Sequence, residues 1–126
     1  MTGLFSTNPK IQEIHNMRKQ LRKLVKQKQH NDALKLGLEI LQKAPYEQNV
    51  LFIVGGMYYM KNQYKTAMPY FEKALDIGAY DVEVLTLKAN SHYFLGEPKK
   101  ALVCCEKIKE IDPKNKTVAE LLSKIK

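Results

Sequence analysis

The chain has 126 residues, 44% hydrophobic and 27% charged, a composition typical of one compact globular domain that excludes a disordered chain. No stretch reaches the roughly 18 apolar residues of a membrane-spanning helix, and residues 1–5 lack the basic start of a secretory signal, so we expect a cytoplasmic protein. The formal net charge of +8 favours partners that carry negative charge.

The first expected helix begins at Pro9 and runs to about Gln27. Asn8 is a favourable N-cap residue, and proline suits the first helical position, where its missing N–H is not needed. The apolar residues of this helix recur at helical spacing and leave the opposite side polar. They are Ile11, Ile14, Leu21 and Leu24.

Most of the positive charge lies on this first helix. Residues 1–30 contain seven Lys or Arg and one acid, Glu13, so this segment carries +6 of the net charge. Five of the basic residues form two neighbouring stripes along the helix, which is either a solvated face or a surface for an acidic partner. The stripes are Arg18, Arg22 and Lys26, and beside them Lys19 and Lys23.

A second helix is expected around Val50–Met60, and it is apolar on all sides. Core packing on one side does not explain such a helix, so its other side should also be covered. Gly55 and Gly56 each weaken its helix propensity by about 1 kcal/mol, so tertiary packing must hold it. Close contact with another helix explains Gly55, whereas Gly56 is better explained by an open groove.

Three features mark the elements that follow. Pro69 lies inside an expected helix and should bend it. The residues from Leu95 to Pro98 form a turn between two helices. A last helix over about 117–126 begins with a capping box from Thr117 to Glu120, and it covers the end of the core with Val118, Leu121, Leu122 and Ile125.

Ala33, Ala67 and Ala101 stand 34 residues apart, within a repeated pattern of large and small apolar residues. A period of this length is typical of two antiparallel helices per unit. Such a unit cannot bury its apolar faces alone, so copies stack into a solenoid. We expect three units over about 14–47, 48–81 and 82–115, within a single domain of residues 1–126.

This pattern resembles the tetratricopeptide repeat family, which has small residues where helices approach closely and a proline after the second helix. The resemblance implies an all-α, right-handed superhelix of three helix-turn-helix repeats with a capping helix. The third repeat departs from the family pattern at Lys88, His92 and Cys105, and the first at Gln20, Leu21 and Gly37, so we expect looser packing in the first. The middle repeat matches best, with Leu51, Val54, Gly55, Tyr58, Ala67, Phe71 and Ala74.

In this family the first helix of each repeat lines a concave groove, so the resemblance implies where a partner binds. The groove would have a basic end and an aromatic floor. The family's groove positions hold His15, Arg18, Arg22, Val25 and Lys26, then Asn49, Phe52, Gly56, Tyr59 and Met60, then Glu83, Thr86, Asn90, Tyr93 and Phe94. As partner-binding residues we select Arg18, Arg22, Lys26, Asn49, Phe52, Gly56, Tyr59, Met60, Asn90, Tyr93 and Phe94.

The leading hypothesis is a protein-binding scaffold that holds a peptide or helix with apolar anchors beside acidic residues. A covered apolar side chain contributes roughly 1.5–3 kcal/mol, against about 0–1 kcal/mol for an exposed ion pair. Replacing Tyr59 and Tyr93 together should therefore weaken binding more than replacing Arg18 and Arg22. The other interpretation of the aromatic residues is that they pack between neighbouring first helices of the repeats or under a chain terminus.

Several alternatives remain open. The chaperone-binding members of the family grip a carboxylate tail with basic and amide residues, whereas this chain has Ile53, Glu83 and Leu87 at three of those places, which argues against that function. Three repeats with an apolar groove also resemble the bacterial secretion chaperones, which hold unfolded export substrates. The basic first helix could instead bind nucleic acid or an anionic membrane surface, and the groove could join two copies of the chain.

We expect no enzymatic activity, cofactor or metal. His15, His30 and His92 are far apart in the repeat, and the chain lacks a glycine-rich phosphate loop and paired carboxylates at catalytic spacing. Cys104 and Cys105 are adjacent, so a disulfide between them would be strained, and we interpret them as reduced, buried side chains.

Overall fold

The computed structural model describes residues 8–125, and within this range every regular element is a helix. The all-α class is therefore confirmed. The helices follow one another with short connections. Residues 1–7 lie outside the described residues, and they include residues 1–5, which lack the basic start of a secretory signal. Lys126, which the sequence predicts to belong to the last helix, also lies outside them. In chain order the helices are α2 (Pro9–Lys26), α3 (His30–Lys43), α4 (Gln48–Met60), α5 (Tyr64–Ile77), α6 (Val82–Phe94), α7 (Pro98–Ile111) and α8 (Lys116–Ile125).

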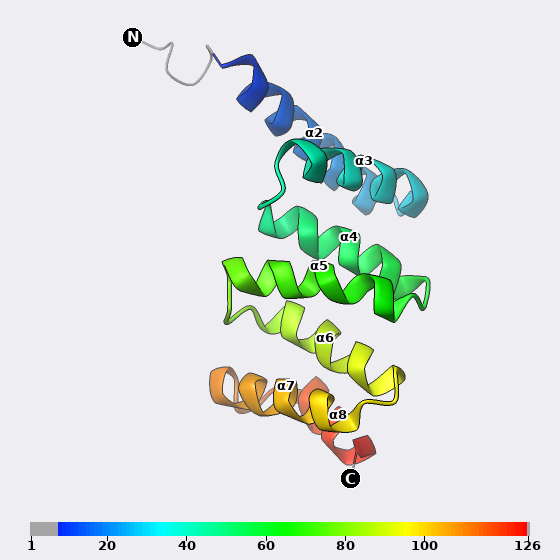
Figure 1. Ribbon diagram of the computed structural model, residues 1–126, viewed down its shortest axis with the longest axis vertical. Helices are drawn as coiled ribbons and strands as arrows, with labels where there is room; N and C mark the ends of the chain where they lie inside the picture. The colour runs from blue at the N-terminus through cyan, green and yellow to red at the C-terminus, as the bar shows by residue number, and fades with distance from the viewer. Residues whose placement is uncertain (1–7, 126) are drawn as a thin grey trace.

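The helices form three consecutive pairs that are stacked along the long axis of the molecule (Figure 1). α2 pairs with α3, α4 with α5, and α6 with α7, and each pair also packs against the next. α8 contacts both α6 and α7 and closes the last pair. Three helix-turn-helix units with a capping helix are therefore confirmed.

The turn inside each pair has the same left-handed residue at its centre. Lys28, Asn62 and Gly96 lie 34 positions apart and have φ angles of 59°, 62° and 76°. In each turn the next amide donates to the carbonyl five residues before it, which is the hydrogen bond that ends many helices. Only Gly96 is a glycine, so Lys28 holds this conformation at a cost of about 1–2 kcal/mol.

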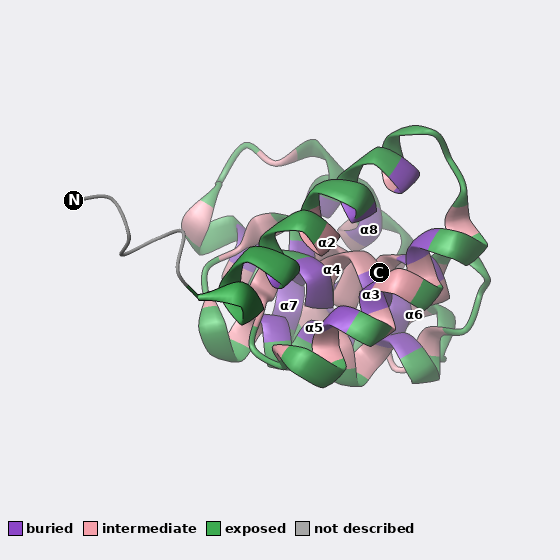
Figure 2. Ribbon diagram, turned by 90° about the horizontal axis from the view of Figure 1, so that it is seen from above, coloured by how far each residue is buried: buried purple, intermediate pink, exposed green. Residues whose placement is uncertain are grey.

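Small residues lie where helices approach closely. Ala33, Ala67 and Ala101 are all 0% exposed, as their spacing predicts. A Cβ added to Gly55 would lie 2.6 Å from Cε1 of the buried Phe71, so α4 and α5 come this close only because position 55 lacks a side chain. Figure 2 shows the buried residues on the helix sides that face other helices, with exposed residues on the outside.

Side chains cap three of the helices. The carboxamide oxygen of Asn8 accepts hydrogen bonds from the amides of residues 10 and 11, so the predicted start of α2 is confirmed. The predicted capping box at Thr117 is wrong, because α8 begins one residue earlier, at Lys116. Asn115 is the side chain that caps it, with Oδ1 2.9 Å from the amide nitrogen of Val118.

The sequence predicted a bend at Pro69 and looser packing in the first pair of helices. α5 continues through Pro69 from Tyr64 to Ile77, and the predicted bend stays a prediction. The two helices of the first pair contact each other less extensively than those of the later pairs, as expected. The contact of this pair with the next is tight, because a Cβ on Gly37 would lie 2.6 Å from Cγ2 of Val54.

None of the helices in residues 8–125 is both long enough and apolar enough to cross a membrane.

Candidate functional site

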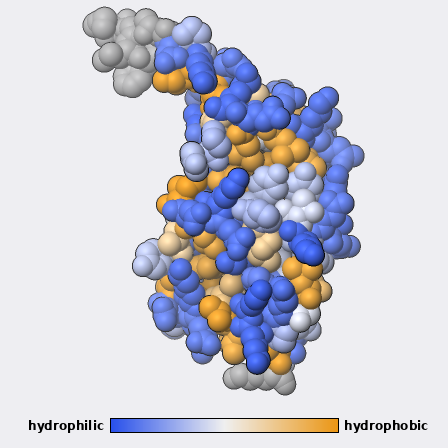
Figure 3. All heavy atoms as spheres, viewed as in Figure 1, coloured by the Kyte–Doolittle hydropathy of each residue, from blue (hydrophilic) through white to orange (hydrophobic). Residues whose placement is uncertain are grey.

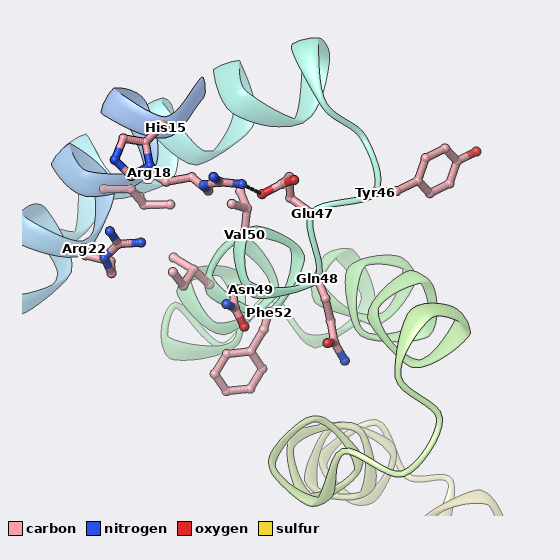
Figure 4. A pocket seen from close by; sticks show the side chains of 11 residues that line it. His15, Arg18, Arg22, Tyr46, Glu47, Gln48, Asn49, Val50 and Phe52 are labelled. Atoms are coloured by element: carbon pink, nitrogen blue, oxygen red, sulfur yellow. Dashed lines mark hydrogen bonds and ion pairs between the residues drawn. The ribbon is translucent and has the colours of Figure 1, made fainter. Parts of the chain in front are cut away.

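An open hollow of about 590 Å³ lies between α2 and α4, next to the start of α4 (Figure 4). α2 contributes basic side chains to it, and α4 contributes apolar and amide side chains. Figure 4 shows Tyr46 extending outward from the loop before α4, away from Arg22. The lining residues are His15, Arg18, Leu21, Arg22, Tyr46, Glu47, Gln48, Asn49, Val50, Phe52 and Ile53.

A second hollow of about 480 Å³ continues from the first towards the end of α2. Arg22 and Ile53 line both hollows, so the two form one surface, which we call the basic groove. The half-buried Ile53 is its shared apolar contact. The second hollow is lined by Arg22, Lys23, Val25, Lys26 and Ile53.

The basic groove is open because the first helices of the pairs are unequally spaced. α4 and α6 contact each other directly, and so do α6 and α8. α2 and α4 do not come as close, and α3, which packs against both, joins them. The space that a neighbouring helix would otherwise cover is therefore accessible to a partner.

One ion pair crosses the groove. Nη1 of Arg18 lies 2.5 Å from Oε1 of Glu47, which joins the middle of α2 to the residue before α4. Both side chains are partly exposed, so the pair contributes at most about 1 kcal/mol to stability. Its main effect is electrostatic, because it neutralises one of the basic groups that face the groove.

The other basic side chains of the groove are not neutralised in this way. Within residues 8–125, no carboxylate lies within ion-pair distance of Arg22, Lys23 or Lys26, and all three are exposed. The one acid on α2, Glu13, pairs with Lys43 of α3 at 3.0 Å and so is not available to them. The groove therefore presents uncompensated positive charge beside an apolar contact.

Four aromatic rings are in contact beyond the groove, at the C-terminal ends of α4 and α6. The ring centroids of Tyr59 and Tyr64 are 5.4 Å apart, those of Tyr64 and Phe94 4.9 Å, and those of Tyr93 and Phe94 5.6 Å. We call these four residues the aromatic cluster. Phe94 is the most exposed member of the cluster, with 53% of its surface exposed. Met60, which follows Tyr59 in the chain, is 56% exposed.

Asparagine side chains contact the hydroxyl groups of two of these tyrosines. The Tyr64 hydroxyl donates to Oδ1 of Asn62 at 2.8 Å. Burial raises the pKa of the Tyr59 hydroxyl above its ordinary value, and its hydrogen bond with Asn90 offsets part of the rise. Tyr59 and Tyr93 also pack against the core, so part of each ring is structural.

The structure separates the predicted binding residues into two groups. Arg18, Arg22, Asn49 and Phe52 line the first hollow, and Lys26 lines the second. Tyr59, Met60, Asn90, Tyr93 and Phe94 lie at or beside the aromatic cluster. Gly56 lies between the groups on α4, and a Cβ added there would have no atom within 4 Å, which is consistent with an open groove.

Sequence reasoning missed several residues of this surface. Tyr64 belongs to a second helix, α5, and the family's groove positions are all on first helices. Glu47 and Tyr46 lie in the loop before α4, where no helical period places a side chain. Ile53 could have been found, because the helix that carries it is apolar on every side. On the face drawn in Figure 3, apolar side chains reach the surface between hydrophilic ones.

The remaining chemically reactive groups form no second site. Residues 8–125 contain no group of three or more His, Cys, Asp or Glu placed to hold a metal ion. Cys104 and Cys105 are free and buried, and burial raises the pKa of both thiols above the ordinary value.

Comparisons with known proteins agree with this architecture. A family model described as "Tetratricopeptide repeat" matches residues 58–125, which is more than half of the chain. No curated protein matches the sequence.

Solved structures of low sequence identity share the fold. The TPR domain of Arabidopsis OM64 has a TM-score of 0.84 at 16% identity, over 93% of this chain and 97% of that chain. The first TPR of Spaghetti (RPAP3), bound to the HSP90 peptide SRMEEVD, has a TM-score of 0.82 at 17% identity, over 90% of each chain. The Yersinia enterocolitica type III secretion chaperone SycD, in complex with a peptide of the translocator YopD, has a TM-score of 0.74 at 13% identity, over 90% and 87%.

Proposed function

We propose that this chain, which belongs to the tetratricopeptide repeat family, is a non-enzymatic module that binds a segment of another protein. The segment lies along the basic groove and the aromatic cluster, and it carries acidic side chains beside apolar ones. One observation carries this proposal: uncompensated basic side chains and a half-buried isoleucine line the same open hollow. Two of the structural neighbours hold peptides, which supports this kind of ligand.

The length of α4 sets the size of the partner segment. Asn49 lies in the first hollow and Tyr59 in the aromatic cluster, ten residues further along the same helix. At 1.5 Å per residue, the two ends of the surface are about 15 Å apart. A partner that reaches both needs about ten residues of helix, or about five residues of extended chain at 3.3 Å each.

The apolar contacts should contribute more to affinity than the charges. Because Met60 is 56% and Phe94 53% exposed, covering the rest of each side chain contributes roughly 0.8–1.6 kcal/mol, or about 1.6–3 kcal/mol for the two together. A partly exposed ion pair contributes about 0–1 kcal/mol. The basic groove therefore sets the orientation of the segment and its association rate, which should fall as salt rises.

The peptide held by the Spaghetti TPR, SRMEEVD, is not our preferred ligand for this chain. Two features oppose a run of acids at the C-terminus of a peptide. Glu47 already neutralises Arg18, and the third pair places Glu83, an exposed acid, where the chaperone-binding members have a basic residue. We therefore propose an internal segment with separated acidic residues.

Selection from a library of random 14-residue peptides displayed on phage tests this function. We expect the enriched peptides to contain at least two large apolar residues and at least one acid. Because Tyr59 and Tyr93 contact the core, Met60→Ser with Phe94→Ser is the cleaner apolar variant, and Arg22→Gln with Lys26→Gln is the matched charge variant. The apolar pair should weaken binding of the selected peptides more, and the charge pair should mainly reduce its salt dependence.

Equal losses, or a loss in the charge variant alone, would contradict this order. Val103→Ser, a change of an exposed apolar residue on α7, is the control and should leave binding unchanged. Failure to enrich any peptide class would contradict the function itself.

The basic residues of α2 favour one alternative, binding to nucleic acid or to an anionic membrane. Lys19 and Lys23 are exposed on this helix together with Arg22 and Lys26. Binding to generic RNA or anionic vesicles that falls steeply between 50 and 200 mM salt would support it. Self-association through the aromatic cluster is the other alternative, and sedimentation of the purified chain would detect it.

A further inference from the structure

The residue immediately before each of α4, α6 and α8 is polar, and the three positions are 34 residues apart. They are Glu47, Asp81 and Asn115. Asp81 and Asn115 each cap the following helix, because their side-chain oxygens accept from Val84 N at 3.2 Å and from Val118 N at 2.9 Å. Glu47 occupies the same position before α4 but its side chain caps no amide.

The Glu47 carboxylate is instead bonded to Arg18 across the basic groove (Figure 4). A glutamate side chain is one methylene longer than an aspartate, which suits it to reach α2 and makes it a poorer cap. Glu47 is therefore at a position where the other two repeats have a helix-capping side chain, but it forms an ion pair with the Arg18 guanidinium in the candidate site instead.

Arg22 lies one helical turn after Arg18 on the same side of α2 and also lines the first hollow. Within residues 8–125 it has no carboxylate at ion-pair distance. Two guanidinium groups thus face one hollow, one occupied by an acid of the chain itself and the other available.

We infer that Glu47 is an internal competitor for the acidic partner. In the free protein it occupies Arg18, so a partner carboxylate binds at Arg22 and reaches Arg18 only by displacing Glu47. This inference rests on the proposed function and specifies its ligand: a segment with one acid at Arg22 and an apolar side chain on Ile53. A second acid placed at Arg18 would meet the like charge of Glu47, so Glu47 selects against closely spaced acids.

Sodium acetate, used as a bare carboxylate probe, tests the inference without any peptide. The Nε–Hε signals of Arg18 and Arg22 are followed by ¹⁵N NMR as acetate replaces chloride at constant ionic strength. In the natural sequence the Arg22 signal should move and the Arg18 signal should stay nearly still. In Glu47→Gln both signals should move.

The control is Glu13→Gln, which removes an acid from α2 that pairs with Lys43 and does not line the groove. It should leave the Arg18 response as it is in the natural sequence. If Arg18 responds to acetate equally with and without Glu47, Glu47 does not compete and the inference is wrong. If neither arginine responds in either protein, the groove does not bind carboxylates and the inference is also wrong.

Peptide affinity provides the second measurement. Glu47→Gln should tighten binding of a selected peptide that has two acids four residues apart by about two- to fivefold, the range of one partly exposed ion pair. It should leave a single-acid peptide unchanged. Equal effects on both peptides would overturn the selectivity while leaving peptide binding established, and an absence of peptide binding would contradict the proposed function alone, because the acetate result stands without it.

Discussion

The two adjacent glycines of α4 offer a sharp test of the packing, because the structure predicts opposite effects for the same substitution. Both positions lie inside one helix, so Gly→Ala improves helix propensity by about 1 kcal/mol at each. The surroundings differ. An added Cβ at Gly56 has no atom within 4 Å, whereas at Gly55 it would lie 2.6 Å from Cε1 and 2.9 Å from Cδ1 of Phe71.

The expected magnitudes follow from these contacts. Gly56→Ala should stabilise the fold by about 1 kcal/mol, because only the propensity changes. Phe71 is fully buried and cannot move its ring aside freely, so Gly55→Ala adds an overpacking cost of about 1–3 kcal/mol. The net effect at Gly55 is a loss of about 0–2 kcal/mol. The two variants should therefore differ by about 1–3 kcal/mol.

Urea denaturation followed by far-UV circular dichroism measures the free energies of unfolding, and thermal unfolding provides a second readout. For a chain of this length 1 kcal/mol corresponds to about 4 °C in Tm, so Gly56→Ala should raise Tm by about 4 °C. The reasoning is refuted if Gly55→Ala is as stable as Gly56→Ala, because Phe71 would then not be packed against α4 as described.

Three further predictions concern the ends of helices and the dependence of the free energy of unfolding on pH at acidic pH. Asn115→Ala should lower the free energy of unfolding, measured by urea denaturation, by about 1 kcal/mol. Thr117→Ala should have little effect. The reverse order would show that Thr117 caps α8, as the sequence predicted. Lys28→Gly should raise stability by about 1 kcal/mol by relieving the left-handed backbone, and unchanged or lower stability would show that this turn is not strained. The hydrogen bond from His92 lowers the pKa of Glu97 below its ordinary value of 4.5, so the Glu97 contribution is present above that pH and is lost as pH falls through the folded pKa. Stability of Glu97→Gln should therefore fall less over that acidic range than stability of the natural sequence, and identical pH profiles would rule this contribution out.

The sequence alone determined the fold, because its information is local and periodic. A helix places residues on one face every three or four positions, so the pattern around Ala33, Ala67 and Ala101 was enough to predict paired helices and their buried sides. The charge of α2 was also evident, since it depends only on which residues the helix contains. The same logic placed Gly55 at a close contact between helices, which the structure confirms.

Tertiary structure decided how far apart those helices lie and which side chains meet between them. No periodic pattern shows that α2 and α4 leave a hollow while α4 and α6 are in contact. Nor does it show that Tyr64 joins the aromatic cluster, or that Glu47 bonds Arg18 and caps no helix. These outcomes depend on distances between residues far apart in the chain, which packing of the whole stack sets, and so the detailed shape of the binding surface became visible only in three dimensions.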